Sequence, residues 1–363
     1  MVPAHGGRVA EPVYRPILAS RRGELEALGH LDSATAPLLA PVLCVSTVDG
    51  HLVELLGRLP AGLVPALDVS ALPDTPETEL VRWGVPVVPV IGLAESDRRL
   101  VAHGVAAQAY TRRAVVRLRA GRDRAGPDAT TAAERIWRYA RLVPEQCDLL
   151  VDAGDVCCPA DLRVTEPRVR RLVEWSRRHA WRSVTVAAGG MPPTVHRLPT
   201  DEPVRLDRWD WLLWERLADL GVGYGDYGVA PAAPGGEVPG DRVPTVRYTT
   251  ETAWWVYRWS RRGGRGDERF ADLCRTLVTA PHWPATGAGF SWGDHELLRR
   301  ARRVAGAGSA ANWTAWSTSH HLAHVLAALT RPAGDRRSGR WGGDEERGRP
   351  GRPHRGGETR RAG

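Results

Sequence analysis

The stretch DLLVDAGDVCCPADLRVTEPRVRRLVEWSRRHAWRSVTVA, residues 148–187, contains one complete unit of the predicted fold. The apolar runs Asp148–Asp152 and Ser183–Ala187 are typical of strands that are covered on both faces. Between them, apolar residues recur at steps of three and four with Arg between, which predicts an amphipathic helix over residues 169–179. The residues of this apolar stripe are Val169, Leu172, Val173 and either Trp175 or Ser176. A strand, a helix and a second strand in this order predict two parallel strands joined by a crossover helix.

Outward from this unit, the same alternation extends over most of the chain. We predict eight strands, at Tyr14–Leu18, Pro41–Val45, Leu63–Val69, Val85–Ile91, Ala114–Leu118, Asp148–Asp152, Ser183–Ala187 and Gly221–Tyr224. The predicted helices are Glu24–Leu31, Leu52–Leu59, Glu77–Trp83, Arg98–His103, Thr131–Leu142, Val169–His179 and Arg208–Leu220. Eight strands alternating with helices indicate an α/β fold, a TIM-like (β/α)8 barrel; a doubly wound open sheet is the alternative.

The pattern changes after the eighth strand. A Pro/Gly loop at 231–244 precedes a Trp/Tyr/Thr-rich stretch at 245–259, which predicts a strand or hairpin. Helices are expected at 268–280, 295–304 and 320–329, so that residues 245–330 complete the barrel or cover one end. We therefore expect one barrel-like domain over 13–330. Residues 1–12 are predicted to be flexible, and the Arg/Gly/Pro-rich tail at 331–363 to be disordered.

The positive charge is concentrated in the tail. The 363 residues carry 50 basic side chains, all Arg, and 42 acidic ones, a net charge of +8. Residues 331–363 hold ten Arg and five acidic residues, which leaves 40 basic and 37 acidic residues, or +3, in positions 1–330. The folded part is thus close to neutral, and the pI near 9.7 is mostly a property of the tail. With 42% apolar residues, disorder throughout the chain is excluded.

The cysteines and the apolar segments indicate a cytoplasmic protein. The five cysteines have no repeated spacing, which argues against a disulfide framework or a zinc site and fits a reduced compartment. Cys157 and Cys158 are either free thiols or a strained vicinal disulfide. Residues 1–12 have no apolar core of a signal peptide. The most apolar stretch, residues 85–94, is half the length of a membrane span, so no membrane role is expected.

Polar residues at the ends of the predicted strands are the candidate site, because barrel enzymes place their active sites where the carboxyl ends of the strands meet the loops. Glu24, Asp152 and Asp226 are the predicted catalytic carboxylates, and Arg21 is the predicted anion clamp. Further polar residues at these ends are Arg22, Asp68, Arg117, Arg119 and Asp155. If the barrel forms, we expect them to converge on one mouth. The alternative is that these Arg and Asp side chains only pair with each other at the rim.

Several local motifs add ligand-binding candidates, each with a simpler structural alternative. YGDYG at 224–228 offers two tyrosine faces and close backbone approach, or forms a tight turn. AAGGMPP at 187–193 follows the seventh strand and forms a phosphate cradle or a plain turn. SWGD at 291–294 either contacts ligand or caps the helix that follows. The candidates from these and other segments are Asp68, Arg117, Gly189, Tyr224, Tyr227, Arg247, Trp292, Asp294 and His321.

Motifs of common cofactor and metal sites are absent from the sequence. There is no GxxxxGK[ST], no GxSxG and no GxGxxG between a strand and a helix. His320 and His324 have the spacing of metal ligands on one helical face, but no HExxH motif or Cys/His cluster accompanies them. We therefore predict no metal site and name no cofactor. A buried or ligand-facing His321 is the preferred interpretation of this segment.

Five motifs in order resemble one known family. They are YRPILASRRGELEAL at 14–28, VPALDVS at 64–70, YGDYGVA at 224–230, VRYTTETAWWVYR at 246–258, and FSWGD at 290–294 together with HH at 320–321. This order is similar to the beta protein family, named after a protein of T-even phages and found in phages and bacteria. The resemblance covers Tyr14 to Leu329 and implies a barrel-like α/β fold with a role in phage–bacterium conflict. It supplies no established catalytic residues. A Lys often stands in the family where Ala19 stands here, with a second basic residue at Arg21.

Two functions are compatible with these features. In the first, the barrel mouth binds a small anionic ligand, phosphorylated or nucleotide-like, and carries out acid–base chemistry on it. In the second, the chain is a non-enzymatic module that binds nucleic acid or protein in phage defence. The second function would use the Trp/Arg segment 254–265 and the Arg-rich tail, and its binding would weaken steeply with added salt.

Overall fold

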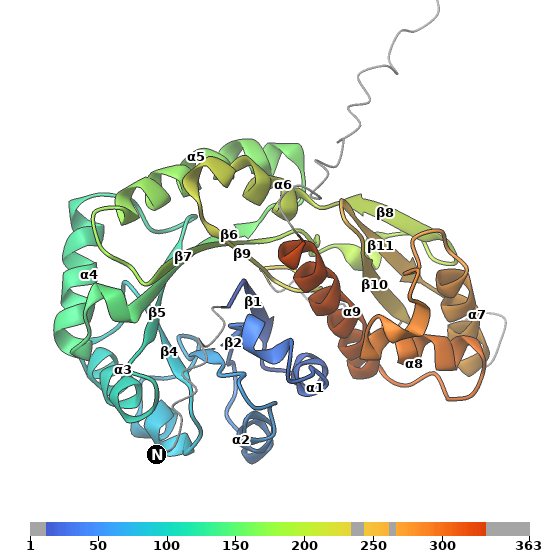
Figure 1. The fold of residues 1–363 in the computed structure, drawn as a ribbon, viewed down its shortest axis with the longest axis horizontal. Coiled ribbons are helices and arrows are strands. Elements are labelled where there is room, and N and C mark those ends of the chain that lie inside the picture. The colour runs from blue at the N-terminus through green and yellow to red at the C-terminus, as the bar shows by residue number, and fades with distance from the viewer. Residues whose placement is uncertain (1–11, 234–242, 261–265, 332–363) are drawn as a thin grey trace, which may run out of the picture.

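The computed structural model describes residues 12–233, 243–260 and 266–331, and it contains a closed parallel barrel (Figure 1). The barrel order is β1-β2-β3-β4-β5-β6-β7-β9, and every neighbouring pair is parallel. Its strands are β1 (Tyr14–Ala19), β2 (Val42–Cys44), β3 (Ala66–Asp68), β4 (Val88–Gly92), β5 (Ala114–Arg119), β6 (Cys147–Asp155), β7 (Ser183–Gly189) and β9 (Gly223–Asp226). All eight predicted strands are confirmed, and the open-sheet alternative is wrong because β1 pairs with β9.

Helices follow most of the barrel strands and surround them. They are α1 (Arg22–Gly29), α2 (Gly50–Gly57), α3 (Asp97–Tyr110), α4 (Pro127–Ala140), α5 (Pro159–Ser176) and α6 (Trp209–Arg216). The α-helix predicted at 77–83 is wrong. That segment instead forms two 3-10 turns, Pro76–Thr78 and Leu80–Trp83, and it ends at Gly84 with a left-handed φ of 68°. Pro76 at the first position and this glycine bracket a segment that is too short for a stable α-helix.

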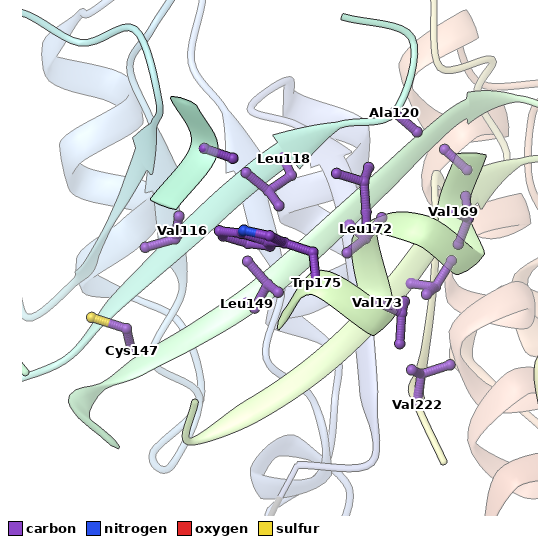
Figure 2. Close-up of a cluster of buried hydrophobic side chains, with 14 of the residues drawn as sticks. Val116, Leu118, Ala120, Cys147, Leu149, Val169, Leu172, Val173, Trp175 and Val222 are labelled. Carbon is purple, nitrogen blue, oxygen red and sulfur yellow. The ribbon is translucent and has the colours of Figure 1, made fainter. Parts of the chain in front are cut away.

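The apolar stripe of α5 packs on the outside of the barrel, as its sequence predicts. Figure 2 shows Leu172, Val173 and Trp175 against strand residues such as Val116 and Leu149. Both Trp175 and Ser176, the two alternatives for the last position of the stripe, are buried. α5 and the strands beneath it therefore belong to one apolar cluster.

The inside of the barrel has an apolar middle and two polar ends. Ile17, Val42, Ala66, Val115 and Leu150 belong to one buried cluster of the interior. Along β6, Asp148, Leu150 and Asp152 share the inner face, since alternate residues of a strand point to the same side. Asp148 lies at the amino end of the strand and Asp152 near its carboxyl end, so the interior carries one polar layer at each end.

A small second sheet lies beside the barrel. β8 (Pro203–Asp207), β10 (Thr245–Thr249) and β11 (Ala253–Arg258) form an antiparallel sheet in the order β10-β11-β8. The hairpin predicted at 245–259 is confirmed as β10 and β11. β8 was not predicted from the sequence; among the described strands it pairs with β11 alone, and its residues are exposed or half-exposed.

The C-terminal helices join this sheet to the barrel. They are α7 (Gly266–Val278), α8 (Trp292–Ala301) and α9 (Ala310–Thr330), and α9 packs against both α1 and β10 (Figure 1). All eight barrel strands come from residues 14–226, so the segment after residue 245 does not complete the barrel. α9 begins ten residues before the predicted helix 320–329, because Ser309 caps its amino end.

The remaining expectations concern the cysteines, a membrane span and the two ends of the chain. All five cysteines are free, which confirms ordinary thiols at Cys157 and Cys158. No helix in the described ranges combines the length and apolarity needed to cross a membrane. The predicted flexible start and the predicted disordered tail lie outside the described residues, apart from Pro12 and Arg331.

Candidate functional site

Arg117 is the centre of a buried polar cluster at the carboxyl end of the barrel. Its Nη1 donates to Asp68 Oδ2 at 2.6 Å, and its Nη2 donates to Asp152 Oδ2 at 2.7 Å. Nη2 also donates to the Tyr227 hydroxyl at 2.8 Å, and that hydroxyl donates to Asp152 Oδ1 at 2.8 Å. Four predicted site residues, from β3, β5, β6 and the segment after β9, therefore meet in one cluster.

Burial and charge together fix the protonation states of this cluster. Burial alone would lower the pKa of Arg117, but Asp152, Tyr227 and Asp68 raise it above its usual range, so the guanidinium stays charged. Burial would raise the pKa of Asp68, but Arg117 and Ser70 lower it, so this group is a carboxylate. Burial and Asp152 hold the pKa of Tyr227 well above its usual value. The cluster thus contains a permanent cation, a carboxylate at Asp68 and a neutral phenol.

A cavity of about 480 Å³ opens above this cluster. Asp155 lies in its wall, and its two carboxylate oxygens accept the backbone N–H groups of Ala232 at 2.6 Å and Ala233 at 3.0 Å. Burial raises the pKa of Asp155, although these backbone bonds oppose the shift. The lining comprises Cys44, Val45, Ser46, Asp68, Ser70, Ala71, Arg117, Arg119, Gly121, Arg122, Asp152, Ala153, Gly154, Asp155, Tyr227, Ala232 and Ala233.

Arg119 differs from Arg117 in how firmly it is held. Its Nη2 reaches Asp68 Oδ2 and Ser70 Oγ only at 3.4 Å, near the limit for a hydrogen bond. Its side chain is 31% exposed, against 5% for Arg117. Arg119 is therefore freer than Arg117 to turn toward a bound molecule.

Asp226 lies in a different network, on the outer side of the barrel. Its Oδ1 accepts the Tyr14 hydroxyl at 2.6 Å and the Gly228 N–H at 2.9 Å. Its Oδ2 lies 2.8 Å from His321 Nε2 and accepts the Tyr224 hydroxyl at 2.9 Å. Burial would raise the pKa of Asp226, but His321 and Arg208 lower it. Asp226 is only 1% exposed, so this network is sealed between the barrel and α9.

Arg208 and Asp210 extend the network toward α6. Arg208 Nη2 donates to Asp210 Oδ2 at 2.9 Å and to the Tyr224 hydroxyl at 2.6 Å. On the other side, His321 Nδ1 lies 2.8 Å from Thr249 Oγ1 of β10. The network therefore connects the barrel, α6, α9 and the small sheet, and its arrangement is that of a structural junction.

Glu24 and its neighbours form a third environment. Glu24 is buried on α1, and burial raises its pKa while Arg21 and Arg247 oppose the shift. Arg21 itself is exposed and precedes the first residue of α1. Arg247 lies on β10, where its Nε has no hydrogen-bond partner among the described residues. Glu24 thus lies within electrostatic reach of Arg21 and Arg247, on a helix that packs against α9.

Asp294 is a helix-capping and core residue. Ser291 caps α8 by accepting the Asp294 N–H at 3.1 Å, which confirms the capping interpretation. The Asp294 carboxylate accepts the Tyr248 hydroxyl at 2.6 Å and lies 2.9 Å from His320 Nδ1. His320 Nε2 lies 2.9 Å from the Thr249 carbonyl oxygen, so both ring nitrogens of His320 are engaged. Neither nitrogen is available to a metal ion in this arrangement.

The last two predicted ligand-binding residues have packing partners. Trp292 stacks on His30 with ring centroids 3.8 Å apart, which joins α8 to the end of α1. Gly189 leaves space for Asp155 and Ala232, since a Cβ at this position would lie 2.9 and 3.0 Å from their atoms. The glycine thus supports the wall of the cavity, as expected for a position of close approach.

The three predicted catalytic carboxylates, Glu24, Asp152 and Asp226, do not meet around one opening. Asp226 is paired with Pro16 and shares the outer face with Tyr14 and Tyr224. Glu24 lies on a helix whose buried side faces away from the barrel interior, toward α9 and Arg247. Only Asp152 reaches the cavity. The expectation of a single mouth is therefore corrected for Glu24 and Asp226.

Several side chains that line the cavity were not predicted from the sequence. Cys44 lies near the end of the second predicted strand and Ser46 directly after it, and Ser70 follows the third. Their positions at strand ends were the available signal, but uncharged residues were not ranked there. Cys44 Sγ lies 3.4 Å from Arg117 Nη1, and burial raises the pKa of its thiol.

The Trp/Arg segment is largely inside the protein. Trp254, Arg258 and Trp259 are buried, and Trp255 stacks on His282 with centroids 4.6 Å apart. The buried rings of Trp254 and Trp259 therefore offer no exposed face of the kind that stacks on nucleobases, whereas Trp255 is half-buried. The rest of this segment, residues 261–265, lies outside the described residues.

Fold and site together define an α/β barrel protein with a buried Arg–Asp–Tyr cluster beneath a cavity at its carboxyl end. Within this class, the sequence matches the family model described as Beta protein over residues 14–327, which is most of the chain. The chain therefore belongs to the beta protein family. A search of curated proteins finds no match.

Proposed function

We propose that this beta-family chain binds a small anionic ligand, phosphorylated or nucleotide-like, in the cavity at the carboxyl end of the barrel. The observation that carries the proposal is the contrast between Arg117, fixed in the floor, and Arg119, loosely held at the wall. The cavity volume of about 480 Å³ is that of small-molecule sites. A barrel mouth at the carboxyl end is also the usual place for such a site.

The side chains have distinct roles in this proposal. Arg119 turns from its 3.4 Å contacts toward the anionic group, with Arg122 of the lining beside it. A guanidinium suits this role because its fork of N–H donors matches the oxygens of a phosphate or carboxylate. Arg117 keeps its bonds to Asp68 and Asp152 and serves as a rigid polar floor. The hydroxyls of Ser46 and Ser70 provide further hydrogen bonds.

Asp155 is the group best suited to move a proton in this cavity. Its raised pKa brings it closer to neutral pH, as acid–base catalysis requires. Asp152 is less suited, because its oxygens are held by the charged guanidinium of Arg117 and by the Tyr227 hydroxyl, whereas those of Asp155 accept neutral backbone N–H groups. We therefore assign the acid–base part of the proposal to Asp155, with Asp152 as an electrostatic anchor, and regard Asp226 and Glu24 as residues of the fold.

Titration calorimetry with adenosine 5′-monophosphate tests the binding proposal. Arg119→Ala is expected to weaken binding about 10- to 100-fold, the equivalent of one lost charged hydrogen bond. Arg138→Ala, which removes an exposed guanidinium on α4, is the matched control and should leave binding unchanged. Equal affinities for the two variants, or no binding by the unaltered chain, would contradict the proposal.

The role in phage–bacterium conflict, which the family resemblance implies, is the cellular part of this proposal. Bacteria that express the chain should reduce phage plaque numbers, and bacteria that express Arg119→Ala should not. Protection that persists fully in Arg119→Ala cells would separate the cellular role from the cavity.

A further inference from the structure

Three arginines surround one aspartate at the amino end of the barrel, opposite the cavity described above. Asp148, near the start of β6, lies 3.1 Å from Arg15 of β1 and 2.8 Å from Arg113, which precedes β5. Arg182, which precedes β7, approaches the same carboxylate at 3.1 Å. Ser183 Oγ adds a hydrogen bond of 2.7 Å to Asp148 Oδ1.

The charges of this cluster do not balance. Three guanidinium groups face one carboxylate, whereas at the other end of the barrel two guanidinium groups, Arg117 and the more distant Arg119, face the two carboxylates Asp68 and Asp152. Burial lowers the pKa of Arg15, and the neighbouring Arg113 and Arg182 lower it further, while Asp148 opposes the shift. Asp148 offsets only one of the three positive charges, so a further anion nearby would reduce the repulsion that remains among the arginines.

Two donors of the cluster are also unused. Arg15 Nε and Arg113 Nε are buried and have no hydrogen-bond partner within the part of the chain that the structure describes. Arg15 is only 6% exposed, so solvent cannot readily satisfy its donor. A buried N–H without a partner is costly, which again indicates a missing acceptor.

A cavity of about 230 Å³ lies next to these side chains. Arg15, Arg182, Ser183 and Thr185 are the polar side chains of its wall that lie nearest the cluster, and Gly223 adds a wall without a side chain. Its volume holds a phosphate-sized group but is small for a nucleotide. The cavity therefore combines excess positive charge, hydroxyl groups and limited space.

We propose that the amino end of the barrel contains a second site, in which Arg15 and Arg182 of the cavity wall bind a phosphate-sized oxyanion, and Arg113, paired with Asp148 beside them, adds positive charge. The oxyanion lies in the cavity, on the side of Arg15 and Arg182 away from Asp148, and accepts hydrogen bonds from these two guanidinium groups and from the hydroxyls of the wall. It is either a free anion or the terminal phosphate of a larger molecule whose remainder extends into solvent. This site does not depend on the function proposed for the carboxyl end.

Titration of the full chain with inorganic phosphate, followed by calorimetry and by the thermal midpoint of unfolding, tests the site. Arg113→Gln and Arg182→Gln change half-exposed side chains, and each is expected to weaken phosphate binding at least about 10-fold. Phosphate should raise the thermal midpoint of the unaltered chain and raise it less in these variants. Arg138→Gln is the control and should behave like the unaltered chain.

Arg119→Ala distinguishes the two ends of the barrel. If the proposal is correct, this variant binds inorganic phosphate normally even where it loses adenosine 5′-monophosphate. Loss of phosphate binding in Arg119→Ala with retention in both Gln variants would place the anion at the carboxyl end and overturn this inference. Loss of both ligands in the Gln variants alone would support the amino-end site and contradict the function proposed above. Absence of phosphate binding up to about 10 mM would overturn the inference directly.

A free anion and a phosphate ester are separated by one further titration. Binding of ribose 5-phosphate to the unaltered chain, lost in Arg182→Gln, would indicate that the site accepts the end of a larger molecule. Binding of inorganic phosphate alone would indicate that the site is closed around a free anion. Either result supports the amino-end site. If neither ribose 5-phosphate nor inorganic phosphate binds, the inference of a second site is overturned.

Discussion

The Tyr14 hydroxyl donates a 2.6 Å hydrogen bond to Asp226 Oδ1 and thereby joins the first and last strands of the barrel across 212 residues. The same carboxylate lies 2.8 Å from His321 of α9, so one buried group ties the closure of the barrel to the C-terminal helices. This arrangement explains why YGDYG and HH, far apart in the sequence, belong to one structural unit.

Asp226→Asn is expected to destabilise the fold by about 3–5 kcal/mol. The change removes the negative charge and leaves Arg208, buried beside it, less well compensated. Urea unfolding measures the effect, and Asp219→Asn, at a side chain 61% exposed, should cost less than about 1 kcal/mol. If Asp226→Asn were as stable as Asp219→Asn but lost ligand binding, Asp226 would be a site residue after all.

Arg117→Gln is expected to destabilise the barrel by about 3–5 kcal/mol as well, because it leaves Asp152 buried without its cation and Asp68 with only the 3.4 Å contact to Arg119. Adding Asp68→Asn to this variant should recover part of the loss, since it removes one of the two poorly compensated charges. Urea unfolding of the single and double variants checks both expectations. A double variant less stable than the sum of the single changes would argue against the charge explanation.

The architecture was predictable because parallel strands covered on both faces are almost continuously apolar. Runs such as Ala114–Leu118 and Asp148–Asp152 stand out against their Arg-rich surroundings. β8 does not stand out, since PVRLD is an edge strand with a starting Pro and partly exposed side chains. The segment 77–83 has a helical pattern, but the turn residues around it prevent a regular helix.

The sequence predicts which polar residues lie at strand ends, but not whether their side chains point into the barrel or outward. Asp68, Arg117 and Asp152 follow from the rule about strand ends, and they do converge. Asp226 satisfies the same rule, yet it points outward. A strand that is apolar on both faces gives no alternation from which to assign its inner side. Asp148 meets Arg15, Arg113 and Arg182 because the starts of β1, β5 and β7 lie at the same end of the barrel. The sequence alone does not show that these three arginines lie close together.

His103 is expected to make the fold less stable in mild acid. This buried residue of α3 has its pKa lowered from 6.5 to about 4 by burial and by Arg99. Between these values the unfolded chain binds a proton that the folded chain excludes, so stability falls as the pH falls from about 6.5 to about 4. At 1.36 kcal/mol per pH unit the loss from this group approaches ~3 kcal/mol.

His103→Leu tests this expectation, because leucine cannot take up the proton. Urea unfolding at about pH 7 and about pH 4.5 should show a smaller loss of stability for the variant than for the unaltered chain. Carboxylates with lowered pKa values, such as Asp148, lose their contribution at lower pH and affect both proteins alike. Identical pH dependence of the two proteins would show that His103 is not the titrating group.

Removal of residues 331–363 tests the rival function, binding of nucleic acid. This segment carries ten Arg and five acidic residues, whereas the described part of the Trp/Arg segment is largely buried. Any affinity of the full chain for a single-stranded DNA oligonucleotide should therefore arise from the tail and fall steeply with added salt. Fluorescence anisotropy in low salt should show loss of this binding in the chain that ends at Thr330, with adenosine 5′-monophosphate binding unchanged. Binding of DNA that survives the truncation and disappears in Arg119→Ala would instead mean that the cavity recognises a nucleic acid.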